Sequence, residues 1–211
     1  MNLSDIRRDY ILEELDENRV SHDPLQQFGL WLNEAIEAKI SDPTAMVLAT
    51  ATPDGIPSAR IVLLKIFSDN GFGFFTNYSS RKGQEIASNN SVALLFHWPE
   101  LERQVRIEGK TLKTPELISE EYFKTRPFES QVSAVISNQS QIIPGREYLE
   151  KLRQAYQNES INNNVTRPSF WGGYMVAPYR IEFWQGRSNR LHDRILYSKG
   201  ESDWIISRLA P

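Results

Sequence analysis

Cations and hydroxyl groups gather in a few short stretches of this 211-residue chain. The sharpest is Ser79-Ser80-Arg81-Lys82, which stands where a short helix is predicted to begin. Free backbone N–H groups and the helix dipole favour an anion at such an end, and the cations and hydroxyls add to that preference. A phosphate group would fit there. A serine cap followed by solvated charges explains the same residues equally well.

Three further stretches hold polar groups whose types could bind a ligand or move a proton. They are Arg60 and Lys65 at the two ends of an apolar run, Gln139-Ser140 in a polar loop, and Trp184-Gln185-Gly186 followed by Arg190-Leu191-His192-Asp193-Arg194. A histidine suits acid–base chemistry because its pKa lies near neutrality. No G-x-S-x-G elbow accompanies the His-Asp pair, so a hydrolase triad is not indicated. A lone loop histidine can also be purely structural.

The spacing within two of these stretches sets geometric conditions. Arg60 and Lys65 are five residues apart, so they face opposite sides of a regular strand. Both reach one ligand only if a bulge or bend intervenes, or if the ligand wraps the strand end. Arg190 and His192 face the same way if their segment is extended, and Leu191 then packs inward.

Several classes of site and partner are excluded by composition. The chain has no cysteine, so disulfides and thiolate chemistry are absent, and its three histidines lack metal-ligand spacing. We therefore expect no metal site. The sequence contains no P-loop and no H-E-x-x-H motif, and Gly71-Phe72-Gly73 fails the dinucleotide fingerprint.

Charge and hydropathy point away from nucleic acid and membranes as partners. The formal net charge is −3, whereas nucleic-acid binders carry a basic excess. No apolar run approaches the ~20 residues of a membrane span, and the N-terminus lacks the apolar core of a signal peptide. We expect a soluble, cytoplasmic protein.

The elements that must position these residues begin with a helix at Asp23-Pro24, with a buried stripe of Leu25, Phe28, Leu32, Ala35 and Ile36. Strands are predicted at 45–52, 59–67, 72–76, 91–98, 104–112, 171–176, 179–184, 194–197 and 204–208. Further helices are predicted at 80–88, from Thr114-Pro115-Glu116 to an interruption at Arg126-Pro127, and at 147–157. Turns between closely spaced strands indicate antiparallel hairpins. The fold class is α+β, a β-barrel surrounded by helices.

Seven stretches, in order, resemble the pyridoxamine 5′-phosphate oxidase family over essentially the whole chain. They are Asp42 to Met46, Arg60 to Lys65, Thr76-Asn77 with Ser80 to Lys82, Leu101 to Val105, Ser169 to Gly173, Ile181 to Gly186, and Arg190 to Arg194. The resemblance implies an FMN-binding split β-barrel that dimerises with FMN at the subunit interface. It implies oxidation of pyridoxamine or pyridoxine 5′-phosphate to pyridoxal 5′-phosphate, with O2 as acceptor and H2O2 as product.

The resemblance also implies the site residues. The FMN-binding set is Arg60, Ile61, Val62, Leu63, Leu64, Lys65, Phe75, Thr76, Arg81, Lys82, Gln104, Gln139, Ser140, Trp184 and Arg194. Lys65, Tyr122, Arg126 and Ser130 would hold the substrate phosphate, and Arg190, Leu191 and His192 would cover its pyridine ring, with Arg190 and His192 as catalytic residues. Arg7, Arg8, Asp9 and Tyr10 would close over the pocket. Phe75 and Gln141 stand where the family often has tyrosine and serine.

The same resemblance implies a flexible N-terminal arm over residues 1–22 and a single FMN-binding domain over 23–211. Two rival functions stay open from sequence. One is a split-barrel enzyme of the flavin reductase type. The other is a non-catalytic protein that binds FMN or pyridoxal phosphate, because a bound cofactor does not prove turnover.

Overall fold

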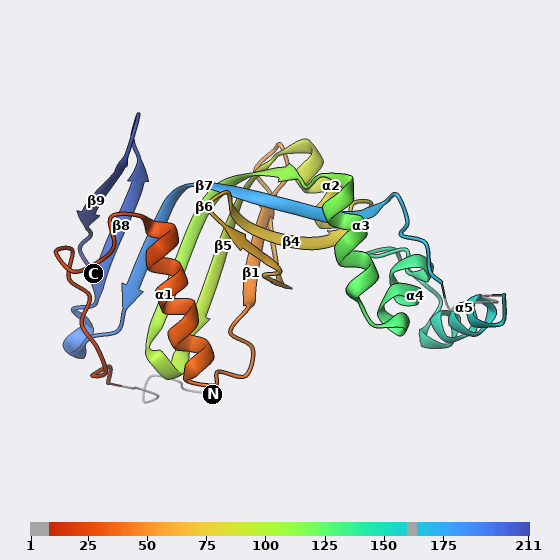
Figure 1. Ribbon diagram of the computed structural model, residues 1–211, viewed down its shortest axis with the longest axis horizontal. Coiled ribbons are helices and arrows are strands. Elements are labelled where there is room, and N and C mark those ends of the chain that lie inside the picture. Colours follow the sequence, from red (N-terminus) through yellow and green to blue (C-terminus); the bar gives the residue numbers. More distant parts are fainter. Residues whose placement is uncertain (1–8, 160–163) are drawn as a thin grey trace.

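The computed structural model describes residues 9–159 and 164–211, and the chain there forms one curled antiparallel sheet with helices against it (Figure 1). The strands are β1 Ala45–Ala51, β2 Pro57–Leu63, β3 Ile66–Ser68, β4 Gly71–Asn77, β5 Ser91–Trp98, β6 Arg103–Lys113, β7 Trp171–Gln185, β8 Asp193–Lys199 and β9 Trp204–Arg208. The α-helices are α1 Pro24–Glu37, α2 Arg81–Ser88, α3 Glu116–Thr125, α4 Phe128–Ile136 and α5 Arg146–Glu159. Short 3-10 turns cover Pro99–Leu101 and Ser188–Arg190. The predicted α+β class is confirmed.

The order of the strands brings the two ends of the sheet together. The main path runs β2-β1-β5-β6-β7-β4-β3, and only Leu64 and Lys65 separate β2 from β3 in the chain. The first and last strands of the path are therefore tethered to each other, so the sheet curls toward a barrel.

The longest strand, β7, changes its pairing partner along one edge, and this divides the barrel into two parts. One edge of β7 pairs with β6 along most of its length, while the other pairs first with β4 and then with β8. The change of partner falls between Val176 and Arg180, where Pro178 has no N–H to donate and the register with β6 shifts at Glu108/Gly109. Two strands predicted at 171–176 and 179–184 are thus one strand, because β6 pairs across the proline.

Helix α1 packs against the curled sheet. Asp23 caps it, accepting a hydrogen bond from the Leu25 backbone N–H at 2.8 Å, as the Asp23-Pro24 pair predicts. Phe28 is fully buried and contacts aromatic rings of β4 and β5. The predicted stripe is wrong at Ile36, which is 51% exposed. Trp31 takes the buried position instead.

Helices α3, α4 and α5 form a lobe at one end of the elongated molecule (Figure 1). A second, smaller apolar cluster of Phe123, Val132, Val165 and Trp171 holds the lobe to the start of β7. Arg126-Pro127 ends α3 as predicted, and α4 begins directly after it. No helix in the described residues is long and apolar enough to cross a membrane.

Candidate functional site

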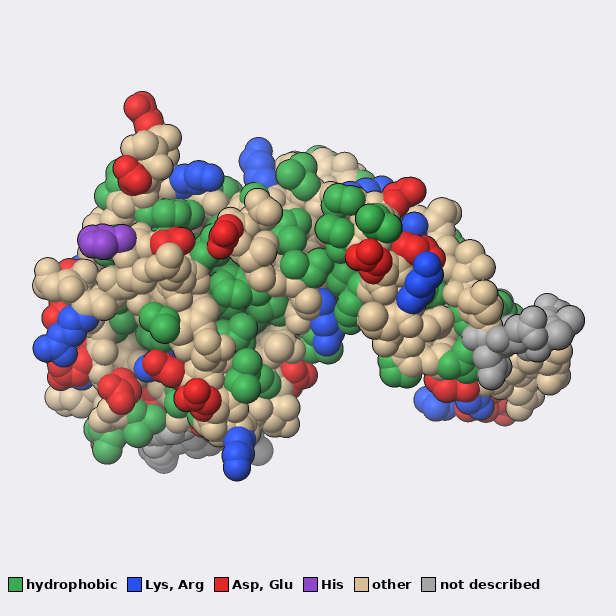
Figure 2. Space-filling model, viewed as in Figure 1, with side chains coloured by type: hydrophobic (Ala, Val, Ile, Leu, Met, Phe, Trp, Pro, Cys, Tyr) green, Lys and Arg blue, Asp and Glu red, His purple; other side chains and the backbone are tan. Residues whose placement is uncertain are grey.

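A cavity of about 490 Å³ lies between the sheet and the helical lobe. Figure 2 shows the surface hollowed between these two parts, with Lys and Arg side chains at the rim of the hollow. The lining residues come from β2, β4, α2, α3, α4, the start of β7 and the loops that follow β2, α3 and α4. They are Arg60, Ile61, Val62, Leu63, Lys65, Phe75, Thr76, Asn77, Lys82, Tyr122, Arg126, Ser133, Ala134, Ser137, Gln139 and Trp171. Most of the sequence-predicted residues up to position 139 meet here.

One corner of the cavity contains cationic and hydrogen-bonding side chains that suit an anion. Ser80 caps α2 by accepting from the Gly83 backbone N–H, as predicted. The Lys82 ammonium donates to the side-chain oxygen of Gln139 at 2.9 Å, and the Thr76 hydroxyl donates to the same oxygen at 3.3 Å. Burial and the Arg60 cation lower the pKa of Lys82. Lys82 donates to the neutral side chains of Ser80 and Gln139, so an anionic ligand would compensate its charge.

Arg60 is held in the wall of the cavity by a buried carboxylate. Its guanidinium donates to the Thr50 hydroxyl at 2.6 Å and to Glu85 at 3.4 Å. Burial alone would raise the pKa of Glu85, but hydrogen bonds from Ser58, Thr50 and Arg81 outweigh it and lower the pKa to about 2. Glu85 is therefore ionised at neutral pH, and Arg60 keeps a fixed partner.

The strand is interrupted between β2 and β3, and this bend is what allows Arg60 and Lys65 to face one ligand. A single strand was predicted over 59–67, and this is wrong because the backbone leaves the ladder at Leu64 and Lys65. The Leu64 N–H donates to Thr44 and the Lys65 N–H to Gly73, at 2.9 and 2.8 Å. This bend lets Arg60 and Lys65 line one cavity. Leu64 itself is buried in the main core and does not line it.

Aromatic rings and an unpaired arginine form the other end of the cavity. Phe75 stacks on Tyr122 with ring centroids 4.0 Å apart and on Trp171 at 5.5 Å. The Arg126 guanidinium lies over the Trp171 ring at 4.7 Å. Its Nη1 atom is buried and has no hydrogen-bond partner among the described residues. Burial lowers the pKa of Arg126, yet an arginine stays charged, so this partly buried cation lacks a counter-charge among the described residues.

A second group of predicted residues lies on the outer face of β6, β7 and β8. Gln104 pairs with Trp184, and Trp184 pairs with Arg194, so the three stand in one row across the sheet. Glu182 is 3% exposed and accepts from Arg194 at 2.8 Å and from Arg106 at 2.5 Å. Arg194 is therefore held as firmly as Arg60 is in the cavity.

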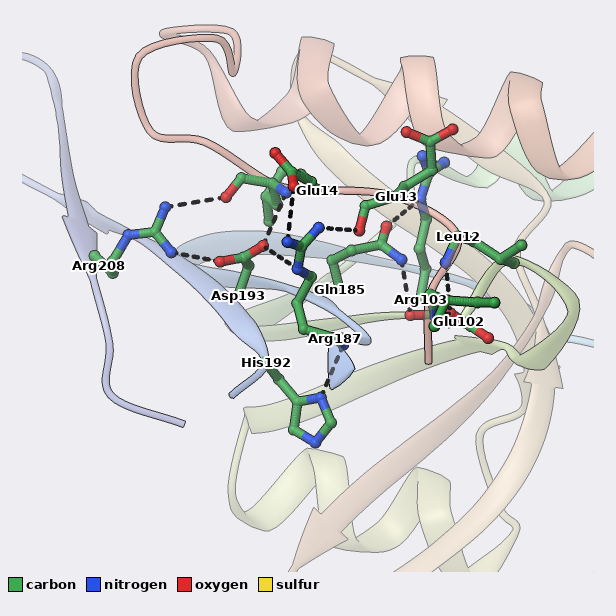
Figure 3. A network of polar contacts seen from close by, with 12 residues as sticks. Leu12, Glu13, Glu14, Glu102, Arg103, Gln185, Arg187, His192, Asp193 and Arg208 are labelled. Carbon is green, nitrogen blue, oxygen red and sulfur yellow. Dashed lines mark hydrogen bonds and ion pairs between the residues drawn. The ribbon is translucent and has the colours of Figure 1, made fainter. Parts of the chain in front are cut away.

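His192 stands beside this row. Its ring lies 4.6 Å from the Trp184 ring and 5.6 Å from the Tyr10 ring. The Arg187 backbone N–H donates to His192 Nδ1 at 3.1 Å (Figure 3). Burial and the Arg190 cation lower the pKa of His192, while Asp193 acts in the opposite direction. The ring is thus neutral near pH 7, with its proton on Nε2.

The segment before His192 is not extended, contrary to the predicted geometry. Asn189 and Arg190 have positive φ angles of 56° and 61°, in the left-handed region. The Leu191 side chain is 68% exposed and does not pack inward. A tight turn, rather than strand alternation, therefore sets where Arg190 and His192 lie.

The two groups are too far apart in one chain to share a ligand. Trp171 borders the cavity and Trp184 belongs to the outer row, thirteen residues further along β7. At about 3.3 Å per residue this is up to roughly 40 Å. Figure 1 shows the two ends of β7 at opposite parts of the molecule.

Several predicted residues lie outside the cavity. The Arg81 side chain turns to Glu85 at 2.8 Å, Ser130 lies on α4 without bordering the cavity, and Ser140 borders only a smaller hollow. Arg7 and Arg8 lie outside the described residues, whereas Asp9 and Tyr10 lie within them. Asn77, Ser133, Ala134, Ser137 and Trp171 line the cavity but were not predicted. The helical spacing of Ser130, Ser133 and Ser137 is the signal that could have found two of them.

Comparison with known proteins covers nearly the whole chain. A family model described as "Pyridoxamine 5'-phosphate oxidase" matches residues 32–155, and one described as "Pyridoxine 5'-phosphate oxidase C-terminal dimerisation region" matches residues 171–211. A protein named pyridoxine/pyridoxamine 5'-phosphate oxidase from Trichormus variabilis is 53% identical over 210 residues, covering 99% of this chain and 98% of its own. One of the same name from Cupriavidus necator is 52% identical, covering 99% of each.

Solved structures share the fold. PhzG from Burkholderia lata, in complex with tetrahydrophenazine-1-carboxylic acid, is 29% identical with a TM-score of 0.89, covering 95% of this chain and 99% of its own. A pyridoxamine 5'-phosphate oxidase-related, FMN-binding protein from Nostoc punctiforme is 14% identical with a TM-score of 0.72, covering 91% and 100%. The predicted split barrel is thereby confirmed.

Proposed function

The chain belongs to the pyridoxamine 5′-phosphate oxidase family, and from that premise we propose that it is an FMN-dependent oxidase making pyridoxal 5′-phosphate from the pyridoxamine or pyridoxine form. The electron acceptor in this proposal is O2 and the second product is H2O2. Relatives that carry the oxidase name match over 99% of the chain, which supports the assignment of the reaction.

The observation that carries the proposal is the buried, unpaired Nη1 of Arg126. A desolvated cation without a partner is costly, and a phosphate monoester would supply both the charge and the acceptor oxygens. Lys65 and Tyr122 border the same cavity, and burial raises the pKa of Tyr122, so its hydroxyl stays a donor. We assign the substrate phosphate to these three residues.

The opposite corner of the cavity fits the phosphate of FMN. Lys82, Thr76 and Gln139 are already hydrogen-bonded to one another there, and Arg60 is fixed by Glu85. The side chains of β2 from Ile61 to Leu63 would border the flavin. When bound, FMN supplies the acceptor for the two electrons that leave the substrate.

The enzyme is a homodimer, since residues 171–211 match a dimerisation region. The proposal places FMN between subunits, with the cavity from one chain and the row of Gln104, Trp184 and Arg194 from its partner. The separation of these groups along β7 supports this, because neither chain alone can surround one cofactor. Exposed apolar side chains such as Ile61 and Leu112, at 63% and 66%, are candidates for the interface.

Within this arrangement Arg190 and His192 would orient the pyridine ring of the substrate. The neutral His192 ring offers a donor at Nε2, because Nδ1 already accepts from Arg187. Fixing the ring holds the reacting carbon in place while the phosphate is anchored away from it.

An aerobic assay for H2O2 with each phosphorylated substrate tests the proposal. Purified protein should be yellow, release FMN that is identified by mass, and form pyridoxal 5′-phosphate with H2O2 in equal amounts. FMN release without turnover would favour a non-catalytic binding protein. Flavin reduction by a nicotinamide without pyridoxal 5′-phosphate would favour the flavin reductase type. The cytoplasmic location stays a prediction, which fractionation of native cells would check.

A further inference from the structure

The chain just after Tyr10 is fastened to the body of the protein by side chains. The Ile11 and Leu12 N–H groups donate to Glu102, at 2.9 and 3.1 Å, and the Leu15 N–H donates to Asp193 at 3.1 Å (Figure 3). The segment is neither helix nor strand, yet several of its backbone polar groups are hydrogen-bonded to the body of the protein. Its path is therefore specific, and it brings the Tyr10 ring against Trp184 and His192.

Arg187 contacts both this segment and His192. Its guanidinium donates to the Glu13 carbonyl at 3.2 Å and to the Glu14 carboxylate at 2.7 Å, and it lies 3.6 Å from Asp193. Its backbone N–H donates to His192 Nδ1. Among the labelled residues of Figure 3, Arg187 is where the dashed lines from the N-terminal segment and from His192 meet.

Apart from these contacts, little packing holds the loop of residues 187–192 in the described structure. Asn189 and Arg190 adopt left-handed φ angles, which asparagine tolerates but which are unfavourable for Arg190. Ser188, Asn189, Arg190 and Leu191 are all exposed, so packing does not fix the turn. The Arg187 side chain is 33% exposed and makes its bonds at the base of the turn. Its contacts therefore compensate for the strain of the turn.

We propose that Arg187 is a positioning residue, which ties residues 13–14 to the loop and thereby fixes the orientation of His192. This rests on the proposed function for the role of His192 in turnover. The Glu14 carboxylate is 70% exposed, and an exposed ion pair contributes little by itself. The restraint comes from the guanidinium fork binding Glu13, Glu14 and Asp193 at once, which a lysine cannot reproduce.

The test compares Arg187→Ala, Arg187→Lys and the control Arg19→Ala in the FMN-loaded dimer. Arg19 has an 83% exposed side chain that lies 3.8 Å from Asp16, and it has no ion pair with residues 187–192 in the described structure. The measurements are steady-state kinetics, the flavin spectrum, the melting temperature and nitrogen NMR of the imidazole rings. The chain has three histidines, so a His192→Asn variant assigns the signal of His192.

Arg187→Ala should keep FMN and the parental melting temperature within a few degrees, yet lower kcat/KM by about tenfold or more. Its His192 signal should change from a single Nε2-protonated form to a mixture of tautomers. The acid-side pKa of kcat/KM should rise, because His192 becomes more solvated. The titratable or charged groups facing His192 are Tyr10, Arg187, Arg190 and Asp193. Arg187→Lys should show a smaller change in the same direction.

Parental kcat/KM together with an unchanged His192 signal in Arg187→Ala would overturn the inference. If that variant does not fold, Arg187→Lys decides by the same two measurements. A parent protein without oxidase activity would remove the proposed function, while the NMR comparison would still decide whether Arg187 orients His192. Arg19→Ala should match the parent in every measurement.

Discussion

At the scale of single residues, the site is marked by charges whose environment is unusual. Arg126 is a partly buried cation whose buried Nη1 atom lacks a hydrogen bond in the described structure, and Lys82 is a partly buried cation bonded to neutral groups. Arg60 and Arg194, by contrast, have buried carboxylates beside them in Glu85 and Glu182. The unpaired cations are suited to take up ligand charge, and the paired ones to keep a fixed geometry.

Arg126→Met should raise KM for the phosphorylated substrate by about tenfold to a hundredfold, since a charge-assisted hydrogen bond is worth roughly 1.5–3 kcal/mol. The melting temperature should stay level or rise, because the change removes a partly buried charge whose Nη1 atom has no partner among the described residues. Steady-state kinetics and calorimetry check both parts. Arg153→Met, which alters a half-exposed arginine 3.6 Å from Glu129, is the control and should change neither. An unchanged KM in Arg126→Met would contradict the phosphate assignment.

The lowered pKa of His192 predicts the pH dependence. Burial and Arg190 favour the neutral ring, so its pKa lies below the ordinary value of about 6.5. If turnover needs the neutral ring, kcat/KM should be near its plateau at neutral pH and should decline as the pH falls through this lowered pKa. A pH profile of the parent and of His192→Asn checks this, since the substrate phosphate titrates equally in both. An acid limb shared by the two proteins would assign the decline to another group.

At the scale of elements, the cavity depends on how β2, β3 and β4 are connected. The bend at Leu64 and Lys65 brings Arg60 and Lys65 to one cavity, and the turn at Gly71 then returns the chain along β4 to Phe75 and Thr76. Gly71 has a φ of +112°, and a Cβ there would lie 2.1 Å from the Val176 carbonyl oxygen. Close approach of β7 therefore requires glycine at this turn.

Gly71→Ala should destabilise the protein by about 1–3 kcal/mol more than Gly55→Ala. Both glycines have positive φ, at +112° and +82°, so both variants carry backbone strain of similar kind. No atom lies within 4 Å of a Cβ at Gly55, so only Gly71→Ala adds a steric clash. Urea unfolding of the two variants at one protein concentration measures the difference. Equal urea midpoints for the two variants would mean that β7 shifts at Val176 and relieves the clash.

At the scale of the whole molecule, the proposed active site is completed by the dimer. The cavity and the row of Gln104, Trp184 and Arg194 lie at opposite ends of β7, and both halves are built within the chain before association. Glu85 holds Arg60 in the cavity, and Glu182 holds Arg194 in the row. In the proposed arrangement, assembly joins two preformed surfaces, and each dimer has two equivalent sites.

At a substrate concentration below the parental KM, mixing two impaired variants should restore activity. Arg126→Met damages the cavity, and His192→Asn damages the partner surface, so a mixed dimer has one site with both changes and one intact site. Random exchange makes half of the dimers mixed, and total activity should reach about a quarter of the parental value. Co-expression or denaturation and refolding of equal amounts, followed by the H2O2 assay, provides the measurement. A mixture no more active than its components would contradict an interface site.

The sequence by itself determined the features that depend on neighbours in the chain. Asp23-Pro24 marks the start of α1 and Ser80 that of α2, because a cap bonds to backbone N–H groups two or three residues away. The alternation of Val105 and Ile107 with polar residues gives the buried face of β6 for the same local reason. The family resemblance added the residues that now meet around the cavity.

Only the tertiary structure decided the features whose partners are distant in sequence. The bend after β2 is stabilised by Thr44 and Gly73, and β7 stays continuous at Pro178 because β6 runs along its edge. The turn before His192 depends on contacts with residues 13–15, more than 170 positions away in the chain. No pattern of adjacent residues encodes such contacts, since the energy that fixes them appears only when the distant segments are already side by side.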